Sequence, residues 1–287
     1  MSYLVRASPL HGARAAPASA YCAALVAAIL LTHNPVLLAA LALAVATAAT
    51  GARVGARVAR SLYLSVPMAL AVALINALVS RNGLTVLARL GDWGPLGQVD
   101  PTLEALAYGA SFGLQLVLTV ALCALWSAAI DPDELLRSLR PVSFRSALTA
   151  TLATRMVPLL AFDAQRIAEA QRTRRRRPTR IAIMRAVTTN ALDRALDIAA
   201  ALEVRGYGTA KPPRATHLPR SRHDIAFGAA ALAITALAAS IAVLHVAPFA
   251  FYPTIHGAPA SAGSAIVGAA FVVLAAAPFT QQRGIAR

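Results

Sequence analysis

Charged residues are scarce in this sequence. They make up 14% of the 287 residues, against about 25% in a typical soluble domain. Hydrophobic residues make up 58%, and the mean hydropathy is +0.62. A soluble domain of this length could not bury apolar runs as long as those found here. The composition therefore indicates an integral membrane protein.

Cysteine and lysine are nearly absent as well. Cys22 and Cys123 both lie inside apolar runs, which is typical of small buried hydrophobic residues and predicts neither a disulfide framework nor a metal site. The only lysine, Lys211, precedes two prolines, whereas a phosphate-binding P-loop needs a glycine-rich stretch ending in Gly-Lys-Ser/Thr. No His-Glu-x-x-His pair and no Gly-x-Ser-x-Gly elbow occurs. We therefore expect no enzyme activity, no bound metal and no cofactor.

Apolar runs suited to crossing a membrane are abundant. A spanning helix needs about 20 apolar residues to cross about 30 Å of hydrocarbon. Asn34-Pro35 separates the first two runs, because Pro35 lacks an N–H group and disfavours helix at Asn34. One long kinked helix over 18–50 is the alternative there. The sequence predicts an all-α integral membrane protein with about six transmembrane helices, roughly at residues 18–33, 35–50, 61–80, 104–130, 225–245 and 263–281.

The positive charge predicts the orientation of these spans. The net charge is +15, and cytoplasmic loops of membrane proteins are enriched in arginine and lysine. With six spans, only Arg81 and Arg89 fall on the side opposite the other basic residues. We therefore expect a multi-pass protein of the cell inner (plasma) membrane, surrounded by the lipid bilayer, with both termini in the cytoplasm. Nucleic acid is not an expected partner, because no aromatic residues interleave the basic run 174–177.

The region 131–224 differs in kind from the rest. It holds 18 of the 27 lysines and arginines and 9 of the 12 aspartates and glutamates. The sequence is therefore divided into an N-terminal membrane region of about four spans (1–130), a cytoplasmic helical region (131–224) and a C-terminal membrane region of about two spans (225–287).

Three helices are predicted in the cytoplasmic region: a short one beginning at Asp131-Pro132, a second from near residue 143 to 177, and a third over 181–203. Gly206 suits a left-handed cap after the third helix. The last two helices are expected to be amphipathic, and each ends in an arginine-bearing tip. The third helix has an apolar stripe at Met184, Val187, Ala191, Ala195, Ile198 and Leu202, with Arg185, Asp193, Arg194 and Asp197 off the stripe.

Four segments of this chain occur in the order seen in the transmembrane T component of energy-coupling factor (ECF) transporters, the EcfT/CbiQ family. They are Asp131–Leu136, Arg155–Leu160, Ala168–Arg172 and Ala201–Gly208. The chain resembles this family from about residue 20 to 281. The specific part of the resemblance is 100–210, and the flanking spans match only in being hydrophobic.

The resemblance implies a scaffold in a vitamin or metal-ion importer. It would link a pair of cytoplasmic ABC-type ATPases to a separate substrate-binding membrane S component. Two coupling helices in this family end in Ala-Arg-Gly-like motifs that insert into grooves of the ATPases. By position, Val204, Arg205 and Gly206 match the second motif, and Thr173, Arg174 and Arg175 match the first.

Arg175 stands where the family usually has glycine, so the register of the first motif has two alternatives, with Arg174 or Arg172 as the operative arginine. Arg155 lies on an apolar part of its helix, where it needs a partner or snorkels to the interface. Asp163 and Glu169 are expected to pair with Arg166 or Arg172–Arg174. The matching segments add the supporting residues Arg155, Pro158, Gln171, Arg172, Glu203, Tyr207 and Gly208.

A self-sufficient membrane carrier or channel with a basic cytoplasmic region is the alternative function. Such a protein would favour ionisable residues within its spans, and the predicted spans contain almost none. The sequence therefore favours the coupling scaffold over the carrier.

Overall fold

The computed structural model describes residues 6–80, 83–87, 101–138, 144–172, 179–206, 221–244, 249, 251–252 and 260–281. These residues are helical apart from short connections and one isolated bridge between Val86 and Thr102. The chain splits into two compact units. We call residues 1–132 with 220–287 the membrane unit, and residues 133–219 the hairpin unit.

The membrane unit contains the apolar helices that the sequence predicts. Four of them are long and apolar enough to cross a membrane: α4 (Gly55–Val79), α5 (Leu103–Ala129), α9 (Arg222–Leu244), and α10 (Ala262–Ala276) with its 3-10 extension η2 (Ala277–Thr280). The shorter apolar helices α2 (Ala15–Leu31) and α3 (Pro35–Gly51) have 17 residues each, about 26 Å of helix. A single turn, α1 (Pro9–Gly12), precedes them. An all-α, multi-pass membrane protein is thus confirmed.

The break at Asn34-Pro35 produces two helices rather than one kinked helix. The Asn34 side chain accepts a hydrogen bond from the Val36 N–H (3.0 Å) and so caps α3, and Pro35 occupies its first turn. A Cβ placed on Gly51, the last residue of α3, would lie 2.5 Å from the ring of Phe279. The same ring packs edge-on against Tyr21, near the start of α2 (6.3 Å between centroids). Because the end of α3 returns to the start of α2, the alternative of one long helix over 18–50 is wrong.

Further contacts place other helix ends at this same end of the membrane unit. The Arg14 N–H, just before α2, donates to Asp224 near the start of α9 (2.7 Å). Trp126, near the end of α5, donates from Nε1 to the Ser19 hydroxyl of α2 (3.2 Å). Helices α2 and α9 therefore start, and α3, α5 and η2 end, at one end of the unit.

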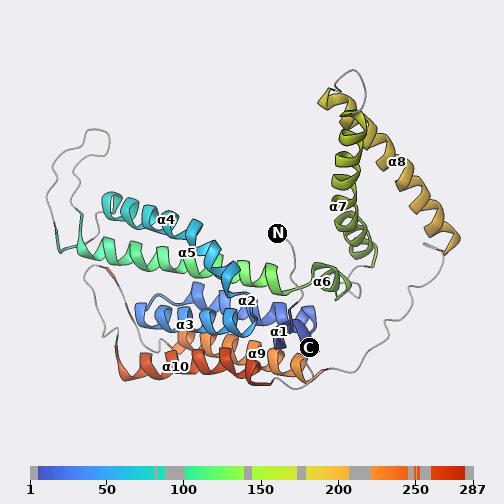
Figure 1. The fold of residues 1–287 in the computed structure, drawn as a ribbon. Coiled ribbons are helices and arrows are strands. Elements are labelled where there is room, and N and C mark those ends of the chain that lie inside the picture. The colour runs from blue at the N-terminus through green and yellow to red at the C-terminus, as the bar shows by residue number, and fades with distance from the viewer. Residues whose placement is uncertain are drawn as a thin grey trace. The chain divides into compact units, whose positions relative to one another are not determined.

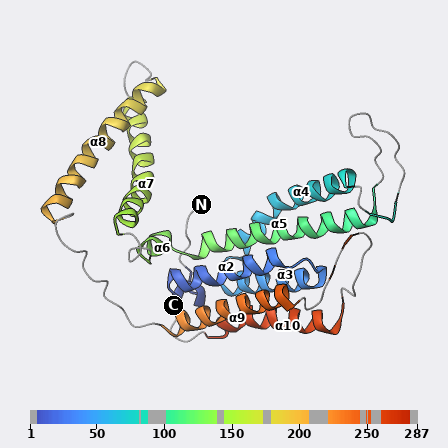
Figure 2. The same cartoon turned by 180° about the vertical axis from the view of Figure 1, so that it is seen from behind.

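The membrane unit is built in layers (Figure 1). Helix α4 packs along α5, α5 lies on α2 and α3, and these two are covered on the other side by α9 and α10, as the reverse view also shows (Figure 2). The core between the last two layers is closely packed. Its largest fully buried side chains include Tyr21, Leu25, Leu38, Leu41, Phe227 and Phe271.

Small residues bring α4 and α5 into close contact. Gly109 and Gly113 of α5 are four residues apart, and Cβ atoms there would lie 2.9 Å from the Ala73 carbonyl oxygen and 2.8 Å from that of Ala69. A small-xxx-small pattern allows such close approach of transmembrane helices, whose association depends on van der Waals packing. The α4–α5 pair therefore depends on the absence of a side chain at these two positions.

Two buried polar side chains tie the layers together. Gln115 of α5 donates from Nε2 to the carbonyl oxygens of Ile29 (3.2 Å) and Thr32 (2.6 Å) at the end of α2. These carbonyls lack partners within their own helix, so Gln115 supplies what the helix end needs. The Tyr21 hydroxyl donates to the Ala275 carbonyl oxygen near the end of α10 (2.9 Å). Both contacts give a hydrogen-bond donor to backbone carbonyl groups, which the hydrocarbon of a membrane cannot do.

The hairpin unit contains α7 (Phe144–Arg172), α8 (Arg180–Val204) and all of α6 (Pro132–Ser138) except its first residue. The three helices predicted in this region are present, with ends within a few residues of the expected ones, although residues 139–143 and 173–178 lie outside the described part. In both views α7 and α8 approach each other where the chain passes from one to the other, and diverge away from that point (Figures 1 and 2). They form the two arms of a V.

Candidate coupling site

The second arginine motif lies at the C-terminal end of α8. The Arg205 N–H donates to the Ala201 carbonyl (3.2 Å) and the Gly206 N–H to the Glu203 carbonyl (2.9 Å). Gly206 has φ 75°, the left-handed conformation that ends many helices and that a side chain would strain. The predicted glycine cap is therefore confirmed. It holds Arg205 at a defined helix end, where a cation also complements the helix dipole.

The side chains around this helix end are open to the surroundings. Glu203 and Arg205 are exposed, and Val204 is 89% exposed. Tyr207 and Gly208 lie outside the described residues. The Val204–Gly206 segment is therefore an exposed cationic tip on a regular helix, a shape that can enter a groove on another protein.

The first motif cannot be placed in the same way. Thr173, Arg174 and Arg175 lie outside the described residues, and Gln171 and Arg172 are described only as the last two helical residues of α7. The choice between Arg174 and Arg172 as the operative arginine thus stays a prediction. Since the motif follows α7 and precedes α8, the 25 residues of α8, about 37 Å of helix, separate it from Arg205 along the chain.

Arg155 is paired, although it lies on the apolar part of its helix. Its Nε donates to Asp133 Oδ2 of α6 at 3.1 Å, and the Arg155 side chain is 65% exposed. The ion pair joins α6 to α7, so of the two predicted alternatives for Arg155 the structure has the one with a partner. Pro158 lies within α7 and is exposed, and the helix continues past it.

Asp163 is paired with α8 rather than with its own helix. Its Oδ2 lies 3.4 Å from Arg194 Nη1 and accepts a hydrogen bond from Asn190 Nδ2 (3.0 Å). The predicted pair of Asp163 with Arg166 is therefore wrong, and the other predicted partners, Arg172–Arg174, have side chains outside the described residues. No sequence signal indicated the observed pair, because the two residues belong to different helices and their spacing along the chain follows no helical period.

The apolar stripe predicted on α8 also needs correction. Val187, Ala191, Ile198 and Leu202 are half-buried as expected, but Met184 and Ala195 are exposed. Arg194, which the periodicity placed off the stripe, is half-buried because it reaches Asp163. The helix therefore turns position 194, rather than 195, toward α7.

The hairpin unit exposes large apolar side chains. On α7 and α8 they include Val157, Phe162, Ile181, Met184, Leu192 and Leu196. Large exposed apolar patches are typical of surfaces that bind a protein or a membrane.

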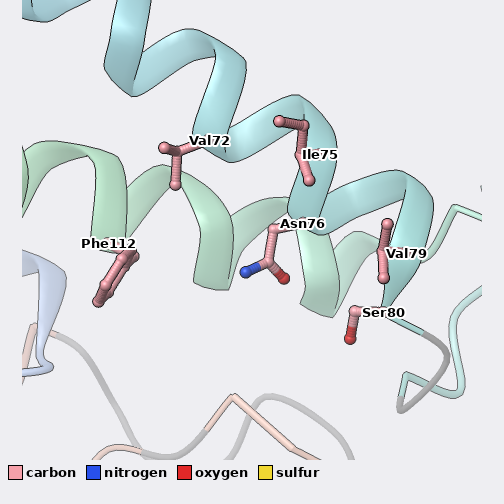
Figure 3. Close-up of a pocket in the computed structure, with 6 residues that line it drawn as sticks. All are labelled: Val72, Ile75, Asn76, Val79, Ser80 and Phe112. Atoms are coloured by element: carbon pink, nitrogen blue, oxygen red, sulfur yellow. The ribbon is translucent and has the colours of Figure 1, made fainter.

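A groove of about 350 Å³ lies in the membrane unit, and none of the predicted site residues is among those that line it (Figure 3). Its lining is mainly apolar, which suits a hydrocarbon chain better than a polar solute. The lining residues are Val72, Ile75, Asn76, Val79 and Ser80, at and just beyond the end of α4, and Phe112 of α5. Among the residues that the structure describes, no group of three or more His, Cys, Asp or Glu could hold a metal ion.

The fold and the exposed tip define a class of protein: a multi-pass helical membrane protein with an arginine-tipped helical hairpin. A family model described as cobalt transport protein (CbiQ) matches residues 6–218. The match covers most of the chain, so the chain belongs to the CbiQ cobalt transport protein family. It includes the hairpin unit up to residue 218 and ends before α9 and α10. No curated protein matches the chain.

Proposed function

We propose that this chain is the energy-coupling subunit of an ABC-type importer. In this role it links two cytoplasmic ATPase subunits to a substrate-binding S component in the membrane. The cargo is a vitamin or a metal ion, and the description of the family names cobalt. The observation that carries the proposal is the exposed Arg205 at the capped end of α8. An arginine there offers a groove two parallel N–H donors for a carboxylate and a permanent charge.

Three further features support the proposal. Along the chain the first arginine motif precedes α8 and the second ends it, and α8 is about 37 Å long, a length that would let the two motifs engage two separate subunits. The exposed apolar side chains of α7 and α8 offer area for a partner. Among the described residues of the membrane unit, the buried carboxylates Glu104 and Asp224 stand in the first turns of α5 and α9, at helix ends rather than midway along a span, where a carrier would favour them.

The central test is co-purification with the ATPase subunits, combined with uptake of the substrate. We expect Arg205→Ala to weaken assembly or uncouple hydrolysis from uptake, because truncating one partner of a desolvated charge pair costs about 2–5 kcal/mol. Arg205→Lys should rescue only in part, since a point charge cannot reproduce the fork. Arg180→Ala, at the start of α8 and outside both motifs, is the control. Normal assembly and uptake by Arg205→Ala would contradict the proposal, and uptake by the chain without partners would favour the carrier.

The proposed membrane is the cell inner (plasma) membrane, and the proposed side for the hairpin unit and both termini is the cytoplasm. Arg14, Arg53, Arg57 and Arg222 support this, because they neighbour helix ends that gather at one end of the membrane unit. Cysteines at Thr179 and Thr209, in a cysteine-free background, should resist an impermeant thiol reagent in intact cells. Rapid labelling of both would reverse the orientation.

A further inference from the structure

A carboxylate stands among the half-buried positions of α7. Leu160, Asp163, Ala164 and Ile167 follow helical spacing, and all four are half-buried. The Asp163 side chain is only 12% exposed, less than expected for an aspartate at the surface of a two-helix hairpin. A position that would suit an apolar residue is therefore occupied by a charge.

The partners of this carboxylate come from one face of α8. Asn190 and Arg194 are four residues apart, which puts them on the same side of the helix. Asn190 donates to Asp163 Oδ2, and Arg194 Nη1 lies 3.4 Å from the same oxygen. The Arg194 side chain is 32% exposed, and within the described structure its buried Nη1 makes no hydrogen bond. The charge of Asp163 is thus what compensates the burial of this nitrogen.

The location of the pair along the two arms matters. Asp163 lies about 14 Å before the end of α7, and Arg194 about 21 Å after the start of α8. Both are well away from the chain connection between the helices, where the arms of the V come together (Figure 1). A contact across diverging arms, at a distance from their junction, limits how far they can open.

We propose that Asp163, Asn190 and Arg194 form a brace that sets the angle between α7 and α8 and thereby positions the Arg205 tip. They are positioning residues. The role of the tip in coupling rests on the proposed function, whereas the angle itself does not. An ion pair buried between helices adds little stability compared with apolar residues of the same size, and its best-attested use is to specify one arrangement. The alternative is a surface ion pair without consequence.

The first experiment measures the angle directly. Spin labels at Ala153 and Ala200, both exposed, report the distance between the far parts of the two arms in a Cys22→Ala, Cys123→Ala background. Ala200 lies about 30 Å along α8 from its start, so a change of about 10° moves it by about 5 Å. We expect Arg194→Asp to shift or broaden the distance distribution by this amount. Asp163→Asn, which keeps the shape of the side chain, should shift it less.

Two control variants test whether the distance depends on opposite charges at positions 163 and 194, rather than on any change of charge in the hairpin unit. The double variant Asp163→Arg with Arg194→Asp restores opposite charges, and Asn190 can accept from an arginine as well as donate to a carboxylate. It should recover the parent distribution. Arg185→Asp makes the same change at an exposed position of α8 and should leave the distance unchanged. Unchanged distances in both Arg194→Asp and Asp163→Asn would overturn the brace.

The second experiment measures uptake per ATP hydrolysed in the assembled transporter. We expect a several-fold loss for Arg194→Asp, recovery in the charge-swapped double variant, and no loss for Arg185→Asp. A shifted distance with full coupling would overturn the positioning of the tip. If the parent chain recruits no ATPase, the proposed function fails, and the distance measurements alone then decide whether the brace sets the angle.

Discussion

The two units of this protein differ in how far they bury their apolar side chains. In the membrane unit, helices α2, α3, α5 and α9 bury large side chains such as Leu38, Leu122 and Phe227 against one another. In the hairpin unit, α8 has no fully buried residue, and α7 has only Ala147 and Thr151 buried among its described side chains. The membrane unit therefore carries its own core, whereas the described part of the hairpin unit leaves most of its large apolar side chains unburied.

This difference bears on how each unit can be perturbed. A close-packed core responds to a change of a single side chain, because its neighbours have little room to move. A hairpin without such a core is held by fewer contacts between its helices, and several of the observed ones are polar. We therefore expect large effects on stability in the first unit, and effects mainly on assembly in the second.

The largest effect is expected at the α4–α5 contact. Gly113→Leu places a side chain against the Ala69 backbone, where even a Cβ would lie 2.8 Å from the carbonyl oxygen. We expect a loss of about 3 kcal/mol or more, seen as a lower thermal midpoint in detergent or as loss of folded protein. Gly228→Leu is the control, since a Cβ there meets nothing within 4 Å. Equal thermal midpoints for Gly113→Leu and Gly228→Leu would show that the stability of the protein does not depend on the close approach of α4 and α5.

An intermediate effect is expected from Gln115. Gln115→Leu leaves the Ile29 and Thr32 carbonyls without their donor and should destabilise the membrane unit by about 1–3 kcal/mol. Thermal unfolding in detergent measures the change. Gln165→Leu, at an exposed position of α7, serves as the matched control in the hairpin unit. If both variants unfold like the parent, the contrast between the units does not extend to their polar contacts.

The smallest effect is expected at the exposed ion pair of the hairpin unit. Arg155→Ala removes the contact with Asp133 and should cost at most about 1 kcal/mol, because solvent screens a pair that is this exposed. The same unfolding measurement applies, with Arg166→Ala as the control at another exposed position of α7. A loss comparable to that of Gly113→Leu would mean that the hairpin unit depends on this pair for its fold.

Helix existence and helix ends followed from local rules. Pro35 after Asn34, the Asp131-Pro132 start and Gly206 at the end of α8 all act on the backbone within a few residues of themselves. The length and hydrophobicity of the apolar runs located the membrane helices, because these too are properties of a continuous stretch of sequence. The Gly109-x-x-x-Gly113 pattern was also present in the sequence and would have indicated a close helix pair.

The pairing of charges did not follow in this way. Asp163 had arginines of its own helix within reach, and only the crossing of α7 and α8 brought Arg194 and Asn190 to it. Likewise, Arg155 found Asp133 on a separate helix. Which charges meet depends on how the helices are placed and rotated about their axes. The apolar periodicity of a helix predicts the side facing its neighbour with an error of at least one residue, since position 194 faces α7 where position 195 was expected.

The sequence by itself determined that the chain is a helical membrane protein, where its helices begin and end, and that an arginine stands at the capped end of α8. These are consequences of hydrophobicity, backbone hydrogen bonding and the special conformations of proline and glycine, all of which are local. Only the tertiary structure decided that α3 returns alongside α2, that α4 touches α5 through backbone, and that Asp163 is held by α8. These depend on contacts between segments far apart in the chain, whose geometry is set by the packing of whole helices.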